Sequence, residues 1–197
     1  MKMRTPGLLI VLSLFTAGTL WGAENEIIEH RNDFGGKTEQ ISYSQEDKEY
    51  KLKRKLNYYD SKGVLRKAVG FRQMNRHNEL KIEKAAEYFS EAGKLMRREI
   101  EIDELKARQI GYDRVITHYN AEGQIVKKAF YYVKTDFGDL IYDRSVDYFE
   151  INGDRVKSEY FLSKEESLRS GFHKLVATYE NGKLIKQELV DERGVTY

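Results

Sequence analysis

The sequence alternates runs of β-branched and aromatic residues with short polar turns that end in glycine. Five such units align on glycines that are 30 residues apart, except for a last interval of 29, and Gly36 is a weaker sixth member. The aligned glycines are Gly63, Gly93, Gly123, Gly153 and Gly182. A fixed period of this length is typical of an architecture in which one supersecondary unit is copied and packs on its neighbours. Strand-forming runs around a polar turn predict a β-hairpin for each unit.

Each glycine is expected to take the positive-φ position of a three-residue loop with a bulge. In that register the residue four before the glycine faces the residue two after it. The predicted pairs are Tyr59 with Leu65, Phe89 with Leu95, Tyr119 with Ile125 and, as an exception to the aromatic–aliphatic pattern, Phe149 with Arg155. Two positions further from the turn, the same register predicts Glu87 opposite Arg97 and Asp147 opposite Lys157.

The segments between the hairpins show no sustained helical period and are short enough to join adjacent antiparallel strands. They contain Met74–Glu79, Asp103–Arg108, Thr135–Asp139 and Ser163–Gly171, and only Ser163–Leu168 is a candidate for a helical turn. Asp191–Gly194 has the composition of the opening of a further, truncated unit. The pattern therefore predicts an all-β fold, an antiparallel meander of about twelve strands built from ~30-residue hairpin repeats, as an extended or curled sheet.

Residues 1–23 have the features of an export signal. Lys2 and Arg4 precede the apolar run Leu8–Phe15, and small residues follow as far as Ala23. The apolar run is shorter than the ~20 residues that a spanning helix prefers, which favours a cleaved signal over a retained anchor. We therefore expect residues 24–197 to form a single domain that is exported to the periplasm, the cell surface or the medium.

The composition narrows the classes of function. The chain has no cysteine, which excludes a disulfide framework, a thiol nucleophile, a cysteine metal site and the lipid-modified cysteine of a lipoprotein. Lys2 and Arg4 account for the whole excess of basic residues, so the remainder is formally neutral and carries no nucleic-acid signal. The single proline, Pro6, also lies in the signal, and a long stretch without proline suits a continuous hydrogen-bonded sheet.

Two of the turns resemble known repeats. Tyr179–Leu184 (YENGKL) resembles the core of the MORN-variant repeats of bacterial proteins, and Tyr59–Leu65 (YDSKGVL) is similar to the tyrosine–aspartate repeats of bacterial toxin shells. The resemblance covers most of Lys55–Leu189, but the period is longer here and the second glycine and the tryptophan usual in MORN repeats are missing. It implies a scaffold of consecutive β-hairpins, and it provides no catalytic residues to transfer.

No motif in the sequence indicates an enzyme, a metal site or another cofactor. The histidines are scattered without the spacing of metal ligands, and they are His30, His77, His118 and His173. Asp136 and Asp139 share one turn with Gly138, but the spaced ligands of a calcium loop are missing, so a turn-forming role is favoured. The serines lack the context of a nucleophile elbow.

Two recurring columns are the candidate binding residues. A basic residue follows each glycine by four positions, giving Lys67, Arg97, Lys127 and Lys157. An aromatic pair precedes each glycine, and its first members are Tyr58, Tyr88, His118 and Tyr148. The basic column is either ordinary cross-strand charge pairing or a binding stripe for an anionic glycan or lipid headgroup. The aromatic column is either cover for the sheet or a ligand platform.

These observations favour an exported, non-enzymatic binding or interaction protein that uses a broad sheet as its contact surface. An envelope glycan, a lipid or another protein is the expected partner, and nucleic acid is not. One alternative is a structural envelope or assembly factor that recruits another chain through its edge strands. An enzyme is the third alternative, and it would require a pocket with convergent polar groups.

Overall fold

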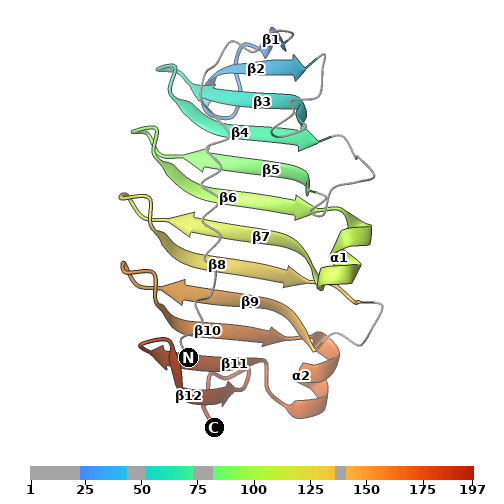
Figure 1. The fold of residues 1–197 in the computed structure, drawn as a ribbon, viewed down its shortest axis with the longest axis vertical. Coiled ribbons are helices and arrows are strands. Elements are labelled where there is room, and N and C mark those ends of the chain that lie inside the picture. Colours follow the sequence, from blue (N-terminus) through green and yellow to red (C-terminus); the bar gives the residue numbers. More distant parts are fainter. Residues whose placement is uncertain (1–22, 44–51, 73–81, 136–140) are drawn as a thin grey trace, which may run out of the picture.

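The computed structural model describes residues 23–43, 52–72, 82–135 and 141–197. They form one antiparallel sheet of twelve strands with two short helices at one end of the strands (Figure 1). The strands are β1 (Ala23–Glu29), β2 (Gly35–Tyr43), β3 (Leu52–Asp60), β4 (Leu65–Arg72), β5 (Ile82–Phe89), β6 (Leu95–Ile102), β7 (Tyr112–Tyr119), β8 (Ile125–Tyr132), β9 (Tyr142–Phe149), β10 (Arg155–Leu162), β11 (Lys174–Glu180) and β12 (Lys183–Val190), and the helices are α1 (Glu104–Ile110) and α2 (Lys164–Ser170).

The strand order in the sheet is the order in the chain, which confirms the predicted all-β antiparallel meander. Figure 1 shows an extended sheet with β1 and β12 at opposite ends, so the sheet is open. β1 begins at Ala23, the last residue of the predicted export signal. The rest of that signal lies outside the described residues, as do Met74–Glu79, His77 and the predicted turn residues Asp136 and Asp139.

The glycine turns have the predicted geometry, except that in the weaker sixth unit Gly35, with a φ of +83°, and not Gly36 takes the positive-φ position. In the turn at Gly63 the Asp60 N–H donates to the carbonyl of Val64 at 2.9 Å, and the Gly63 N–H donates to the carbonyl of Asp60 at 3.0 Å. Gly63 has a φ of +79° and Gly123 a φ of +84°. A Cβ added at Gly123 would have no atom within 4 Å, so the positive φ, and not crowding, requires glycine there.

The last two turns explain irregularities in the sequence. Glu180 pairs with Lys183, and the two residues between them, Asn181 and Gly182, both have positive φ. This two-residue turn is one residue shorter than the others, which accounts for the last interval of 29 residues. In the segment that follows β12, the Asp191 N–H donates to the carbonyl of Val195 at 3.1 Å and Gly194 has a φ of +79°. The predicted truncated unit therefore forms the same kind of turn as the one at Gly63.

The register next to each turn confirms part of the prediction and corrects the rest. Each of the four predicted pairs nearest the turns is present, including Tyr59 with Leu65. Beyond that pair the returning strand carries one additional residue, a further β-bulge that the predicted register did not include, so that Tyr88 and not Glu87 faces Arg97. The predicted pairs of Glu87 with Arg97 and of Asp147 with Lys157 are therefore wrong. Glu87 faces Arg98, and Asp147 faces Ser158.

The two helices begin at capping side chains. At α1, a carboxylate oxygen of Asp103 accepts hydrogen bonds from the N–H groups of Leu105 and Lys106, and Gly111 ends the helix with a φ of +89°. At α2, the Ser163 hydroxyl accepts from the Glu166 N–H, which is one half of a capping box, while the Ser163 N–H donates to the Ile141 carbonyl at 2.8 Å. The predicted helical turn at Ser163–Leu168 is thus confirmed. Asp103–Arg108 joins the adjacent strands β6 and β7, as predicted. The helix α1 within this segment was not predicted, because seven residues are too few to show a helical period.

The sheet has little conventional core. No second sheet covers either face within the described ranges, and the hydrophobic residues that are buried are mostly small. They are Ala68, Val69, Ala86, Ile102, Ala107, Val115, Ala129, Val146, Ala177 and Val190. Small residues in a pleated sheet become buried when longer neighbours on the same face fold over them. Both faces therefore present side chains to the surroundings.

Replacing Gly123 by valine tests the turn. Because a β-branched residue disfavours positive φ, Gly123→Val should lower the free energy of unfolding by about 1–2 kcal/mol, measured by denaturant unfolding. Gly123→Asn is the matched control and should cost less, since asparagine tolerates this conformation, as Asn181 does with a φ of +50°. Equal stability of the valine variant and the unsubstituted protein would contradict the turn geometry.

Candidate functional site

The bulged register brings all eight predicted binding residues into a single row across one face of the sheet. Each pair of neighbours in this row is a facing pair on adjacent strands from β3 to β10. In order, the residues are Tyr58, Lys67, Tyr88, Arg97, His118, Lys127, Tyr148 and Lys157, and we name them the cation–aromatic row. In the sequence these residues form two separate columns, one basic and one aromatic, and the additional residue in each returning strand merges them into one alternating series.

The cations of the row lie over the aromatic rings beside them. The Lys67 ammonium is 5.4 Å from the ring centre of Tyr58 and 5.1 Å from that of Tyr88. The Arg97 guanidinium is 4.3 Å from the Tyr88 ring centre. These distances are within the range of cation–π attraction, worth about 0.5–1 kcal/mol at exposed sites.

The same arrangement recurs around Tyr148, which has the Lys127 ammonium at 5.6 Å and the Lys157 ammonium at 5.2 Å from its ring centre. His118 occupies an aromatic position between two cations of the row. Burial, and then the charges of Lys127 and Arg97, lower the pKa of His118 below its ordinary value. This favours the neutral imidazole, which is the aromatic-slot role expected from the sequence.

The cations of the row differ in whether a carboxylate neutralises them. Arg97 forms an ion pair with Glu99, and Lys157 forms one with Glu159 at 3.0 Å. The residues two positions after Lys67 and Lys127 are Val69 and Ala129, where no such carboxylate exists. Among the described residues, Lys67 and Lys127 have no ion pair, so they are the cations with charge available to a ligand.

Glu159 is a carboxylate of this face that accepts hydrogen bonds from three side chains. It accepts from the ammonium groups of Lys174 and Lys157, each at 3.0 Å, and from the Tyr148 hydroxyl at 2.8 Å. Burial alone would raise the pKa of Glu159, but the hydrogen bonds from Lys174, Lys157 and Tyr148 outweigh it and lower the pKa to about 2. Burial and the hydrogen bond to Glu159 raise the pKa of Tyr148 to about 12. The carboxylate therefore neutralises the row at its β10 end.

A second cation–aromatic row, which the sequence analysis missed, runs parallel on the same face. Its stacked pairs are Arg54 with Phe71 at 4.6 Å, Arg114 with Tyr131 at 3.9 Å and Arg144 with Phe161 at 4.1 Å. Small residues such as Val69, Ala86, Ala129 and Val146 lie between the two rows and are buried. In the sequence, the residues of this second row are basic or aromatic residues that lie four positions further from each turn than the first row. Only the correct register shows that they face each other.

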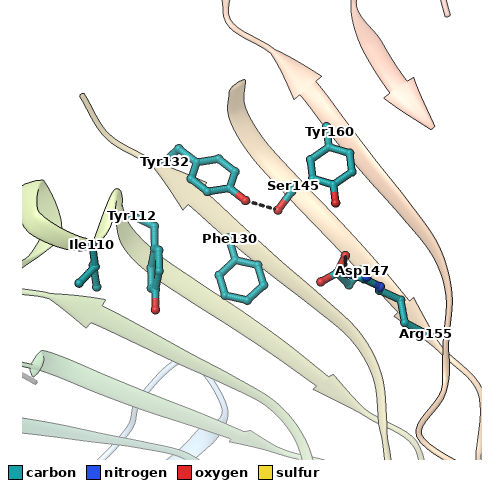
Figure 2. A pocket seen from close by; sticks show the side chains of 8 residues that line it. All are labelled: Ile110, Tyr112, Phe130, Tyr132, Ser145, Asp147, Arg155 and Tyr160. Atoms are coloured by element: carbon teal, nitrogen blue, oxygen red, sulfur yellow. Dashed lines mark hydrogen bonds and ion pairs between the residues drawn. The ribbon is translucent and has the colours of Figure 1, made fainter. Parts of the chain in front are cut away.

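The opposite face holds a pocket of about 300 Å³ between α1 and strands β7 to β10. Figure 2 shows its lining, which consists of Ile110, Tyr112, Phe130, Tyr132, Ser145, Asp147, Arg155 and Tyr160. The Tyr132 hydroxyl and the Ser145 hydroxyl share a hydrogen bond of 2.8 Å. The Asp147 carboxylate accepts from the Ser158 hydroxyl at 2.6 Å and lies 3.8 Å from the Arg155 guanidinium. None of these residues was a candidate from the sequence.

A cluster of buried charges lies on the same face as the pocket, on β3, β5 and β6. Glu87 is 2% exposed and accepts from Nε of Arg98 at 2.8 Å. Burial raises the pKa of Glu87, while Arg98 and Lys55 oppose the rise. Burial lowers the pKa of Lys55 to about 8, against the charges of Glu87 and Glu39. Since each charge has an opposite partner, a structural role is sufficient to explain the cluster.

Within the described part of the chain, no three histidine or carboxylate side chains are grouped so as to hold a metal ion. None of its helices is long and apolar enough to cross a membrane. A scan of the sequence against protein-family models gives no match, and a search of curated proteins gives no significant match. The fold defines the class of the protein as an all-β protein of antiparallel hairpins in one open sheet.

The network of Glu159 predicts an acid-dependent loss of stability. A carboxylate whose pKa falls from 4.5 to about 2 on folding stabilises the fold above pH 4.5, and this contribution is lost as the pH falls towards 2. Allowing for screening by solvent, the loss should be about 1–2 kcal/mol. Glu159→Gln should be less stable at pH 7 and should show a flatter profile between pH 4.5 and 2 in denaturant unfolding.

Glu180→Gln is the control for this measurement, because Glu180 is exposed on β11 and forms no ion pair within the described chain. Its stability profile should follow that of the unsubstituted protein. A Glu159→Gln profile that also follows the unsubstituted protein would show that the network contributes nothing to stability.

Proposed function

We propose that this chain is an exported, non-enzymatic binding protein, and that the face with the cation–aromatic row is its contact surface for an anionic polymer of the cell envelope. The observation that carries the proposal is the row itself, in which cations and rings alternate over strands β3 to β10. Export is inferred from the signal-like residues 1–23.

The spacing of the available charges favours an extended ligand. Lys67 lies on β4 and Lys127 on β8, four strand spacings apart, which is about 19 Å. One compact headgroup cannot contact both ammonium groups at that separation, whereas a linear anionic glycan can cross the sheet and meet each in turn. The neutralised cations Arg97 and Lys157 alternate with them and limit the overall charge of the face.

The aromatic members add contact area that depends little on charge. Tyr58, Tyr88 and Tyr148 offer large and rigid side chains with few rotatable bonds, which lose little entropy on binding. The same cation–ring pair recurs from strand to strand, while catalysis would require one convergent group of acid, base or nucleophile. Recurrence of one contact along a surface therefore supports binding rather than chemistry.

A second candidate function is assembly through the last strand. Leu184 and Ile185 of β12 are 50% and 58% exposed. The C-terminal segment covers β12 only near its end, where Val190 bridges to Thr196 and the Leu189 N–H donates to the Tyr197 carbonyl at 3.3 Å. An edge strand with exposed apolar residues is suited to pairing with a strand of another chain.

Reversing the two available charges tests the first proposal. The double variant Lys67→Glu, Lys127→Glu should bind polygalacturonate, a linear anionic glycan, at least tenfold more weakly in a calorimetric titration at low salt. Binding by the unsubstituted protein should also weaken as salt rises, since screening shortens the reach of the charges. The melting temperature should fall by a few degrees at most, because the variant loses cation–π contacts worth about 0.5–1 kcal/mol each but no ion pair with a described residue.

The matched control is Lys62→Glu, Lys164→Glu, which changes the net charge equally at exposed positions outside the row. Equal affinities of both double variants for polygalacturonate would contradict the proposal, because net charge would then explain all binding.

Vesicles with and without phosphatidylglycerol form the second arm of the experiment. Preferential binding to the anionic vesicles would show that the ligand is a lipid surface and not a glycan. Concentration-dependent self-association that survives the charge reversal would favour the edge-strand alternative.

A further inference from the structure

The pocket on the opposite face exists because one small residue lies between two aromatic ones. Ser145 on β9 faces Phe130 on β8 and Tyr160 on β10. The neighbouring strands fill the same row with larger apolar residues, namely Ile100, Val115 and Leu175. Ser145 is 2% exposed and is one of the residues that line the pocket, where it lies among Phe130, Tyr132 and Tyr160 (Figure 2).

Helix α1 and the ends of the strands complete the walls. Tyr112 packs edge to face against Phe130, with ring centres 5.4 Å apart, and Ile110 of α1 lies beside Tyr112 (Figure 2). Tyr160 on the other side is held by Tyr142, also at 5.4 Å between ring centres. The rings are thus fixed by neighbours before any ligand arrives, which lowers the entropic cost of binding.

The polar groups of the pocket are placed around this aromatic wall. Tyr132 and Ser145 contribute hydroxyls that bond to each other, and Asp147 and Arg155 lie at the opposite end from Ile110 (Figure 2). The contacts of Asp147 with Ser158 and with Arg155 both involve Oδ1. Neither contact occupies its Oδ2, so within the described residues this oxygen can accept a hydrogen bond from a ligand, and Arg155 has further N–H groups to donate.

The combination of groups selects the chemistry of the ligand. A purely apolar ligand would separate Asp147 and Arg155 from water without replacing their hydrogen bonds, which is costly. A strongly charged ligand gains little, because Asp147 and Arg155 already balance one another. A neutral ring with one apolar face and hydroxyls on its edge satisfies both the aromatic wall and the polar end.

We propose that this pocket binds a pyranose ring of a neutral saccharide. A volume of about 300 Å³ is at the small end of ligand sites, which suits one sugar ring better than a long aliphatic chain. The C–H face of the sugar packs on the rings of Tyr112, Phe130 and Tyr160, and its hydroxyls bond to Asp147, Arg155 and the Tyr132–Ser145 pair. The site lies on the face opposite to the cation–aromatic row and does not depend on the function proposed for that row.

The test is a titration of the full chain, labelled with ¹⁵N, with maltohexaose, cellohexaose and chitohexaose. At least one of them should shift the backbone amide signals of the pocket residues. Ser145→Leu, which fills the gap without removing a ring, should weaken that binding at least tenfold, and Tyr112→Ala should do the same. Tyr132→Phe keeps the ring but removes the hydroxyl, so it should weaken binding several-fold without unfolding the protein.

Tyr131→Ala is the matched control, since it removes a tyrosine from the same strand as Phe130 and Tyr132 but from the opposite face. Its affinity for the sugar should equal that of the unsubstituted protein. The proposal is overturned if none of the three saccharides shifts the pocket signals, or if Ser145→Leu binds as well as the unsubstituted protein. Loss of sugar binding in the Lys67→Glu, Lys127→Glu variant but not in Ser145→Leu would also overturn it, because the sugar would then bind the other face.

Discussion

The additional residue that follows each glycine turn is the constraint on which the surface of this protein depends. A strand places alternate side chains on opposite faces, so one extra residue decides which residues face each other beyond it. Because the bulge recurs at the same place in each of the five glycine hairpins, Tyr88 faces Arg97 and His118 faces Lys127. Without the bulge, Arg97 would face the carboxylate of Glu87 in the hairpin of β5 and β6. The continuous cation–aromatic row would then not form.

The sheet is stabilised by contacts between strands rather than by a covering layer. Lysine, arginine and tyrosine side chains extend over alanine and valine of the adjacent strands, and the stacked pairs such as Arg114 with Tyr131 replace much of the packing that a second layer would give. Each pair contributes little, but many occur side by side. The consequence for function is that two chemically different faces stay accessible, one with rows of cations and rings and one with an aromatic pocket beside α1.

The sequence was sufficient for the features that depend on local chemistry. A glycine with positive φ marks each turn, so the number, order and direction of the strands and the pair Tyr59 with Leu65 could be predicted. Features that depend on neighbouring strands could not. The bulge places Tyr88, and not Glu87, opposite Arg97. Helix α1 is too short to show a helical period of apolar residues in the sequence, although Asp103 and Gly111 cap it. The pocket requires Ser145 between Phe130 and Tyr160, which only the register reveals.

The bulge, and with it the cation–aromatic row, is tested most directly by measuring the register between β5 and β6. Nuclear Overhauser contacts between backbone protons identify the residues that face each other in an antiparallel pair. The bulged register predicts contacts that link Tyr88 with Arg97 and Glu87 with Arg98, together with a break in the pattern before Phe89 and Leu95. An unbroken series of contacts that links Glu87 with Arg97 would contradict it, because the cation–aromatic row could then not exist as a row.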